Sequence, residues 1–185
     1  MENQLIDINN IKIASNLLNT IVKKTPLHFN GRLSDSNNCS VWLKREDLQE
    51  VRSFKIRGAF NKIYSLKNTE RKKGIVCSSA GNHAQGFAKS CMELKIKGTV
   101  FMPTITPKQK IEQVKMFGGD YIKIVLEGDT YDDTYISAKK FCDFNKMEFI
   151  HPFDDVSVIE GQATLALEIL SQKKHPIDYI IVPIG

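Results

Sequence analysis

Short apolar runs rich in β-branched residues alternate along this chain with longer segments of helical periodicity. The apolar runs predict strands at 40–44, 74–78, 98–102, 121–126, 148–150 and 179–182. The periodic segments repeat apolar residues every three or four positions and predict helices at 9–23, 54–66, 82–95, 107–118, 131–142 and 158–170. Strands that alternate with helices form parallel sheets covered on both faces, so the sequence predicts an α/β fold.

Polar residues that favour helix caps precede three of these segments. Ser53 stands before the helix at 54–66, and Asp129 stands before the helix at 131–142. Thr106 is followed by Pro107 and by a glutamine three residues on, the pattern of a capping box. A polar turn is expected at 34–38. We expect the three polar residues to cap their helices.

Composition and charge narrow the class of protein. The chain has 185 residues, 42% of them hydrophobic and 25% charged, which is enough to bury the core of one domain or two small ones. The formal net charge is +5, but the lysines occur as scattered pairs without interleaved aromatic residues. Such lysines are typical of a solvated surface, so we expect no nucleic-acid partner.

Cysteine spacing and the lengths of the apolar runs indicate in which cellular compartment the protein is expected. Four cysteines show neither a Cys-x-x-Cys pair nor a spacing with histidine suited to zinc, so no metal site is expected. They are interpreted as small buried residues in a reducing compartment. Neither a signal peptide nor an apolar run of about 20 residues is visible, so we expect a cytoplasmic protein with no membrane partner.

The segment Ser53-Phe54-Lys55-Ile56-Arg57-Gly58-Ala59 places a lysine in the first turn of a helix. The helix dipole disfavours a cation at this end. Lys55 is therefore either a surface lysine that reaches water or a lysine of lowered pKa whose amine can form a Schiff base. The segment alone leaves both interpretations open.

The segment Cys77-Ser78-Ser79-Ala80-Gly81-Asn82-His83-Ala84-Gln85-Gly86 connects a predicted strand to a predicted helix. Amides exposed at such a helix start bind anions. The alternative is an ordinary turn capped by Ser79 or Asn82. The spacing matches neither a P-loop nor Gly-x-Gly-x-x-Gly, which argues against a nucleotide-binding module.

Together the two segments resemble the fold-type II pyridoxal-phosphate enzymes, and most closely the threonine ammonia-lyases (threonine dehydratases). The resemblance runs from Ile21 to Gly185 and includes Lys-Thr-Pro-Leu at 24–27 and Leu-Lys-Arg-Glu-Asp-Leu-Gln at 43–49. It implies a tryptophan-synthase-β-like fold with open parallel sheets, truncated here. Residues 1–49 would begin a large domain, 50–145 would form a small α/β domain, and 146–185 would return to the large domain before its glycine-rich phosphate loop.

The same resemblance implies roles for individual residues in binding pyridoxal 5'-phosphate. Lys55 would form the Schiff base and act as the catalytic base, Phe54 would pack against the cofactor ring, and Asn82 would hydrogen-bond the ring hydroxyl. Gly185 would be the first glycine of the phosphate loop. The loop residues expected to receive the substrate carboxylate are Ser79, Gly81, Asn82 and His83.

The activity that the resemblance implies is the deamination of L-threonine to 2-oxobutanoate and ammonia, within isoleucine biosynthesis and by a longer, homo-oligomeric parent enzyme. Ala80 stands where serine racemases carry a proton-donating serine, which favours elimination. Gly161-Gln162-Ala163-Thr164 resembles a family segment with glycine in place of Ala163. Structural roles are expected for Arg57, Glu46 and Asp47. The alternatives are an L-serine or 3-hydroxyaspartate ammonia-lyase, or a non-catalytic fragment.

Overall fold

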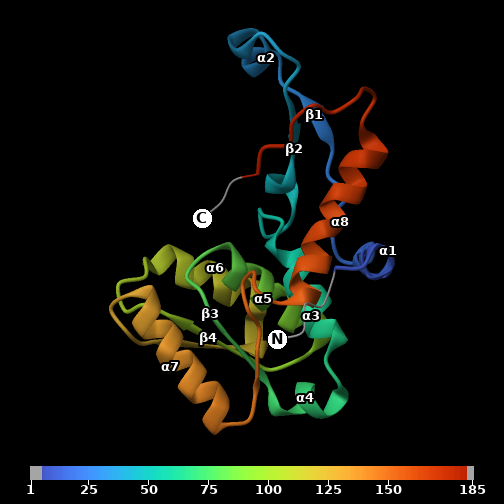
Figure 1. Ribbon diagram of the computed structural model, residues 1–185. Helices are drawn as coiled ribbons and strands as arrows, with labels where there is room; N and C mark the ends of the chain where they lie inside the picture. Colours follow the sequence, from blue (N-terminus) through green and yellow to red (C-terminus); the bar gives the residue numbers. More distant parts are fainter. Residues whose placement is uncertain (1–5, 183–185) are drawn as a thin grey trace.

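The computed structural model describes residues 6–182 and has two parts, a layered α/β body and an arm that projects from it (Figure 1). The body contains a four-stranded parallel sheet in the order β5-β4-β3-β6. These strands have the bounds β3 Ile75–Ser78, β4 Gly98–Met102, β5 Ile122–Leu126 and β6 Glu148–Phe149. The predicted α/β class and the four strands in this region are confirmed.

Helices cover both faces of the sheet, as the alternating pattern predicted. Helices α5 (Asn82–Leu94) and α6 (Lys108–Gly118) pack on one face, and α7 (Tyr131–Phe144) packs on the other. Side chains of β3 alternate between these layers because strand residues point to opposite faces in turn. Ile75 and Cys77 lie in the core beneath α5, whereas Val76 lies in the smaller core beneath α7.

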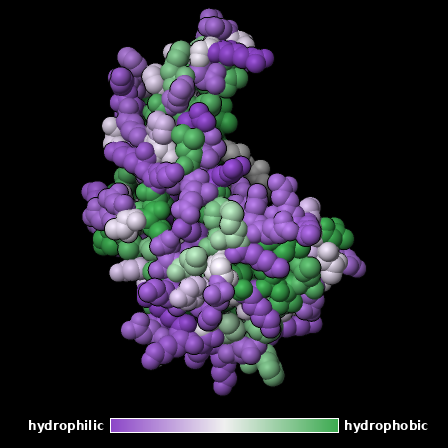
Figure 2. Space-filling model, turned by 180° about the vertical axis from the view of Figure 1, so that it is seen from behind, coloured by the Kyte–Doolittle hydropathy of each residue, from purple (hydrophilic) through white to green (hydrophobic). Residues whose placement is uncertain are grey.

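The arm consists of a short antiparallel pair of strands with helices beside it and at its tip. Strand β1 (Leu27–Phe29) pairs with β2 (Trp42–Lys44), and α2 (Gly31–Asn37) connects them. Helix α8 (Val156–Gln172) runs along this pair in Figure 1. Figure 2 shows apolar side chains exposed on the arm as well as on one side of the body. The prediction of a polar turn at 34–38 is wrong for 34–37, since a helix capped by the Asn30 side chain covers these residues and only Asn38, its left-handed C-cap, lies in a turn.

Helix α3 (Lys55–Ser65) lies between α5 and α8 and joins the body to the arm. Two close backbone approaches hold it there. A Cβ atom at Gly86 of α5 would lie 2.9 Å from the Ile56 backbone nitrogen, and one at Gly161 of α8 would lie 2.6 Å from the Arg57 carbonyl oxygen. Helices can approach this closely only where one of them carries no side chain. The position of Lys55 is therefore fixed by glycines far from it in sequence.

All three predicted helix caps are wrong. Helix α3 begins after Phe54, and the buried hydroxyl of Ser53 has no hydrogen-bond partner. Helix α6 begins after Pro107, so Thr106 lies one residue too early to reach its free amides. Helix α7 is capped by Thr130, while the Asp129 carboxylate accepts a hydrogen bond from Thr104. In each case the backbone conformation moves the helix start past the polar residue.

Other elements differ from the sequence prediction at the ends of the chain and between α3 and β3. Helix α1 (Ile8–Leu18) ends before the predicted residue 23, and the helix α4 (Asn68–Lys73) was not predicted. Residues 179–182 form no strand, because no strand of the described residues pairs with them, and Ile181 is 92% exposed. Two 3₁₀ helices complete the described elements, η1 (Glu46–Leu48) and η2 (Gly119–Tyr121).

The expected division into domains at 49/50 and 145/146 stays a prediction. Strand β6 follows residue 145 and pairs with β3 in the body, while α3 contacts both the body and α8. Across residues 6–182 we find no helix long and apolar enough to cross a membrane. Cys77, Cys91 and Cys142 are buried as predicted, but Cys39 beside α2 is exposed.

Candidate active site

Lys55 is the first residue of α3, and its side chain is half-buried where the body meets the arm. Its Nζ atom donates a hydrogen bond to the Pro152 carbonyl oxygen at 3.0 Å, and it lies 5.4 Å from the centroid of the Phe54 ring. Burial lowers the pKa of the Lys55 amine below its usual value, because the charged form loses hydration. A lysine in this environment is a better nucleophile than one in water.

The loop after β3 leads directly into α5, whose N-terminus packs on the start of α3. The Ser79 amide donates to Phe101 of β4, and the Ser79 hydroxyl accepts a hydrogen bond from the Gly81 amide at 3.2 Å. A Cβ atom at Gly81 would meet no atom within 4 Å, so the helix start faces open space. Asn82 is exposed there. The first amides of a helix have no acceptor within it, so this end can bind an anion.

Two buried polar groups lie close to this loop. The Ser78 hydroxyl at the end of β3 and the Nδ1 atom of His83 have no hydrogen-bond partner among the described residues. The His83 Nε2 atom lies 3.1 Å from the Ile150 carbonyl oxygen, an acceptor, so Nε2 carries the ring proton. Burial lowers the pKa of His83 to about 4. His83 is therefore a neutral ring anchored to the end of β6.

A buried ion network fixes the other side of α3. The Arg57 guanidinium, 1% exposed, donates two hydrogen bonds of 2.9 Å to Glu46 and one of 2.7 Å to Glu168. Lys44 forms a second ion pair with Glu168 at 2.5 Å. The structural roles predicted for Arg57 and Glu46 are confirmed. Asp47 instead pairs with Arg45 at the surface.

The network and the lysine contact include residues that the sequence analysis missed, namely Glu168 and Pro152. Each is about 100 residues or more from its partner in the chain, with separations of 111 for Arg57–Glu168 and 97 for Lys55–Pro152. A single sequence carries no signal for such pairs. The motif around Gly161 could have directed attention to α8, because Gln162 accepts a hydrogen bond from the Gly58 amide.

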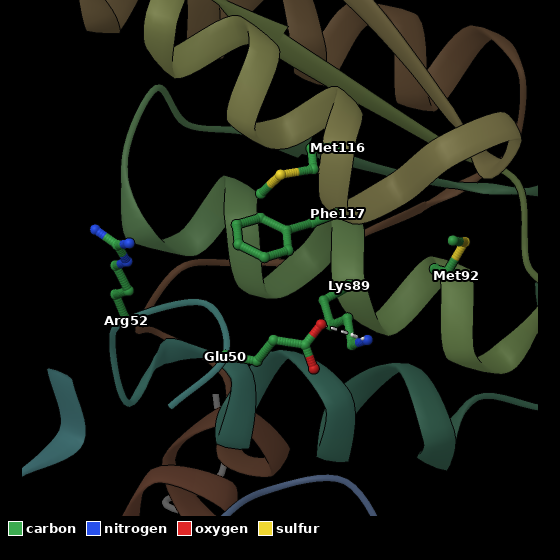
Figure 3. Close-up of a pocket in the computed structure, with 6 residues that line it drawn as sticks. All are labelled: Glu50, Arg52, Lys89, Met92, Met116 and Phe117. Atoms are coloured by element: carbon green, nitrogen blue, oxygen red, sulfur yellow. Dashed lines mark ion pairs between the residues drawn. The ribbon is translucent and has the colours of Figure 1, made fainter. Parts of the chain in front are cut away.

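The predicted site residues Phe54, Lys55 and 79–83 thus lie around the junction of β3, α3 and α5, whereas Gly185 lies outside the described residues. A separate hollow of about 380 Å³ opens between α5, α6 and the loop before α3, and the sticks in Figure 3 show it. Lys89 in this hollow is paired with Glu50 at 2.8 Å. Its lining contains none of the predicted site residues.

Comparisons with known proteins agree with this geometry. The family model described as "Pyridoxal-phosphate dependent enzyme" matches residues 18–185. The biosynthetic L-threonine dehydratase of Halalkalibacterium halodurans is 51% identical over 97% of this chain, and that of Bacillus subtilis is 48% identical over all of it. This chain spans 43% and 44% of these two relatives, which is less than half of their length.

Solved structures show the same likeness. The processed form of threonine deaminase isoform 2 from Solanum lycopersicum superimposes with a TM-score of 0.82 at 37% identity, over 91% of this chain and 47% of that one. A serine racemase from Dictyostelium discoideum superimposes with a TM-score of 0.82 at 30% identity, over 92% of this chain and 54% of that one. This chain belongs to the family of pyridoxal-phosphate dependent enzymes.

Proposed function

We propose that this chain supplies the reactive lysine and the substrate loop of a threonine dehydratase, which converts L-threonine to 2-oxobutanoate and ammonia as part of a longer enzyme. The observation that carries the proposal is the contact at Gly86, which brings the N-terminus of α5 against the backbone of Lys55 and Ile56. This contact joins an amine of lowered pKa to an anion-binding helix end. The relatives named above support threonine as the substrate.

The residues present fit pyridoxal phosphate as the cofactor. The aldehyde of this cofactor needs a lysine amine, and Lys55 offers one that is half-buried and already turned toward protein rather than water. The flat ring needs an apolar neighbour, and the half-buried Phe54 ring lies beside the amine. The buried Ser78 hydroxyl and His83 Nδ1 are unpaired among the described residues, so the region retains unused polar groups.

Each of these residues has a role in the proposed reaction. The cofactor, when bound, supplies an electron-withdrawing ring that stabilises negative charge at the substrate Cα. Lys55 would hold the cofactor and, once the substrate amine has taken its place, the free Lys55 amine would remove the Cα proton as a general base, which its lowered pKa favours. The amides at the start of α5, with Ser79, Gly81, Asn82 and His83 around them, orient the substrate carboxylate.

Elimination requires that the Cα proton is removed and not returned from the opposite face. Ala80 lies in the substrate loop and has no proton to donate. In the overall reaction the β-hydroxyl leaves, and hydrolysis of the remaining unsaturated amine releases ammonia and the 2-oxo acid. We further propose that the parent enzyme serves isoleucine synthesis in the cytoplasm as a homo-oligomer, with the domain division at 49/50 and 145/146.

A chimeric enzyme tests this function. This chain replaces the aligned portion of the Bacillus subtilis relative, and release of 2-oxo acid is measured from L-threonine, L-serine and 3-hydroxyaspartate. We expect the highest kcat/KM for threonine and a loss of activity in the Lys55→Ala chimera. The Lys110→Ala chimera removes an exposed lysine of α6 and serves as the matched control.

Two outcomes would contradict the proposal. One is a folded chimera that carries the cofactor and prefers serine or 3-hydroxyaspartate, which would support the corresponding ammonia-lyase. The other is a Lys55→Ala chimera as active as the Lys110→Ala control, which would remove Lys55 from the reaction.

A further inference from the structure

The segment Ile150-His151-Pro152-Phe153-Asp154, called here the 150–154 turn, connects the end of β6 to α8 and contacts the site from outside both sequence motifs. Its Pro152 carbonyl oxygen is the acceptor for Lys55 Nζ at 3.0 Å. Its Ile150 carbonyl oxygen is the acceptor for the His83 ring. The 150–154 turn therefore holds one side chain from α3 and one from α5, and its own conformation sets where the Lys55 amine rests.

The His151 imidazole maintains that conformation from within the turn. Its Nδ1 atom accepts hydrogen bonds from the backbone amides of Asp154 at 2.7 Å and Phe153 at 3.3 Å. This is the arrangement by which asparagine side chains close turns on the residues that follow them. The carbonyl between these groups belongs to Pro152, so the ring hydrogen bonds fix the direction in which this carbonyl points.

The imidazole is itself held by aromatic neighbours. The Phe153 ring packs edge-on against it with centroids 4.6 Å apart, and the rings of Tyr135 and Phe149 each lie 6.4 Å away. Both backbone amides require an unprotonated Nδ1 atom. Burial lowers the pKa of His151, as do Lys139 and Lys55, whereas Asp154 and Asp155 raise it, and the net direction favours this neutral ring.

We propose that His151 is a positioning residue for Lys55, acting through the Pro152 carbonyl that it aims at the Lys55 amine. The amine is thereby kept beside the Phe54 ring and away from bulk water. This inference rests on the function proposed for Lys55, but it concerns the side chain alone and makes a prediction for the protein without cofactor.

Two substitutions separate the hydrogen bonds from the bulk of the ring. His151→Asn keeps an acceptor on the atom bonded to Cγ, where Oδ1 takes the place of Nδ1. His151→Leu keeps comparable apolar volume and removes the acceptor. If His151 acts through its hydrogen bonds, the asparagine variant retains the position of Lys55 and the leucine variant loses it.

The readout is the pH profile of Lys55 modification by a trace amount of acetic anhydride, mapped by mass spectrometry. The profile reports both the pKa of the amine and its accessibility. In His151→Leu we expect the midpoint to rise toward the ordinary lysine value of about 10.4, because the released amine regains hydration. In His151→Asn we expect the Lys55 midpoint to equal that of the unaltered protein. Lys89, ion-paired on α5, should keep its profile in all three proteins and reports that they are folded.

A His151→Leu profile identical to that of the unaltered protein, with Lys89 unchanged, would overturn the inference. So would equal shifts in the asparagine and leucine variants, since the acceptor atom would then be irrelevant. If the leucine variant fails to fold, the asparagine variant still decides, because a shifted Lys55 midpoint there contradicts the proposal. Failure of the proposed function would appear separately, as an inactive chimera with these profiles unaffected.

Discussion

The two site motifs approach each other closely at Gly86, and replacing this glycine by alanine measures how much the site depends on the approach. The new Cβ atom would lie 2.9 Å from the Ile56 nitrogen and 3.0 Å from both the Ile56 Cα atom and the Lys55 carbonyl carbon. All three are backbone atoms of α3, so no flexible side chain can move aside. Helix α3 must shift away from α5, and Lys55 must shift with it.

The size of the effect follows from two opposing contributions. Forcing an extra methyl group into a packed interface costs about 1–3 kcal/mol. Alanine within a helix is favoured over glycine by up to about 1 kcal/mol. Taking the middle of the first range, about 2 kcal/mol, less a gain of up to about 1 kcal/mol, we expect Gly86→Ala to lower the free energy of unfolding by about 1–2 kcal/mol.

Urea unfolding of Gly86→Ala beside Gly31→Ala provides the assay. A Cβ atom at Gly31 in α2 would have its nearest neighbour at 3.9 Å, an ordinary contact, so this control should stay within about 0.5 kcal/mol of the unaltered protein. Equal stability of the two variants would refute the reasoning, because it would show that α3 and α5 separate at no cost.

Three further predictions concern buried groups. Arg57→Ala removes the cation that pairs with buried Glu46 and leaves Glu168 with Lys44 alone, so it should destabilise the protein by about 3–5 kcal/mol in urea unfolding; a loss under 1 kcal/mol, on the order of an exposed ion pair, would contradict a buried network. The pKa of His83 is depressed to about 4, so its neutral ring contributes about 3 kcal/mol to the free energy of unfolding. This contribution is complete above pH 6.5 and is lost as the pH falls through 4. His83→Gln should flatten this pH dependence while His28→Gln, an exposed control, should not; an unchanged slope in His83→Gln would exclude His83 as the cause. Exposed Cys39 should react with a thiol reagent well before the buried cysteines, whose thiol pKa values burial raises, and simultaneous reaction in the folded protein would contradict their burial.

The strands and helices of the body could be predicted from the sequence because their patterns are local. The run 98–102 lies between Lys97 and Pro103 and forms β4 with those bounds, and the segment 82–95 forms α5 to within one residue. The caps could not be predicted in this way. Ser53 and Thr106 are suitable capping residues, but α3 begins only after Phe54, and Pro107, with an extended ψ of 136°, stands outside α6.

The candidate site was partly predictable for a related reason. Lys55 and the loop at 79–83 were found because each forms a continuous motif, and their proximity follows from Gly86, which lies inside the second motif. Glu168 and the 150–154 turn were missed because they join the site through contacts between distant segments. Residues 179–182 have the composition of a strand, but a strand also needs a neighbour, and composition does not reveal whether one is present.

The central claim is that Lys55 is the lysine that binds pyridoxal phosphate, and a covalent map tests it most directly. The chain is mixed with the cofactor, treated with borohydride to make any lysine linkage permanent, and digested for mass spectrometry, with Lys55→Ala and Lys110→Ala in parallel. We predict that the added mass lies on Lys55, together with a visible absorption band that Lys55→Ala lacks and Lys110→Ala keeps. Added mass spread over exposed lysines, with equal bands in all three proteins, would contradict the account.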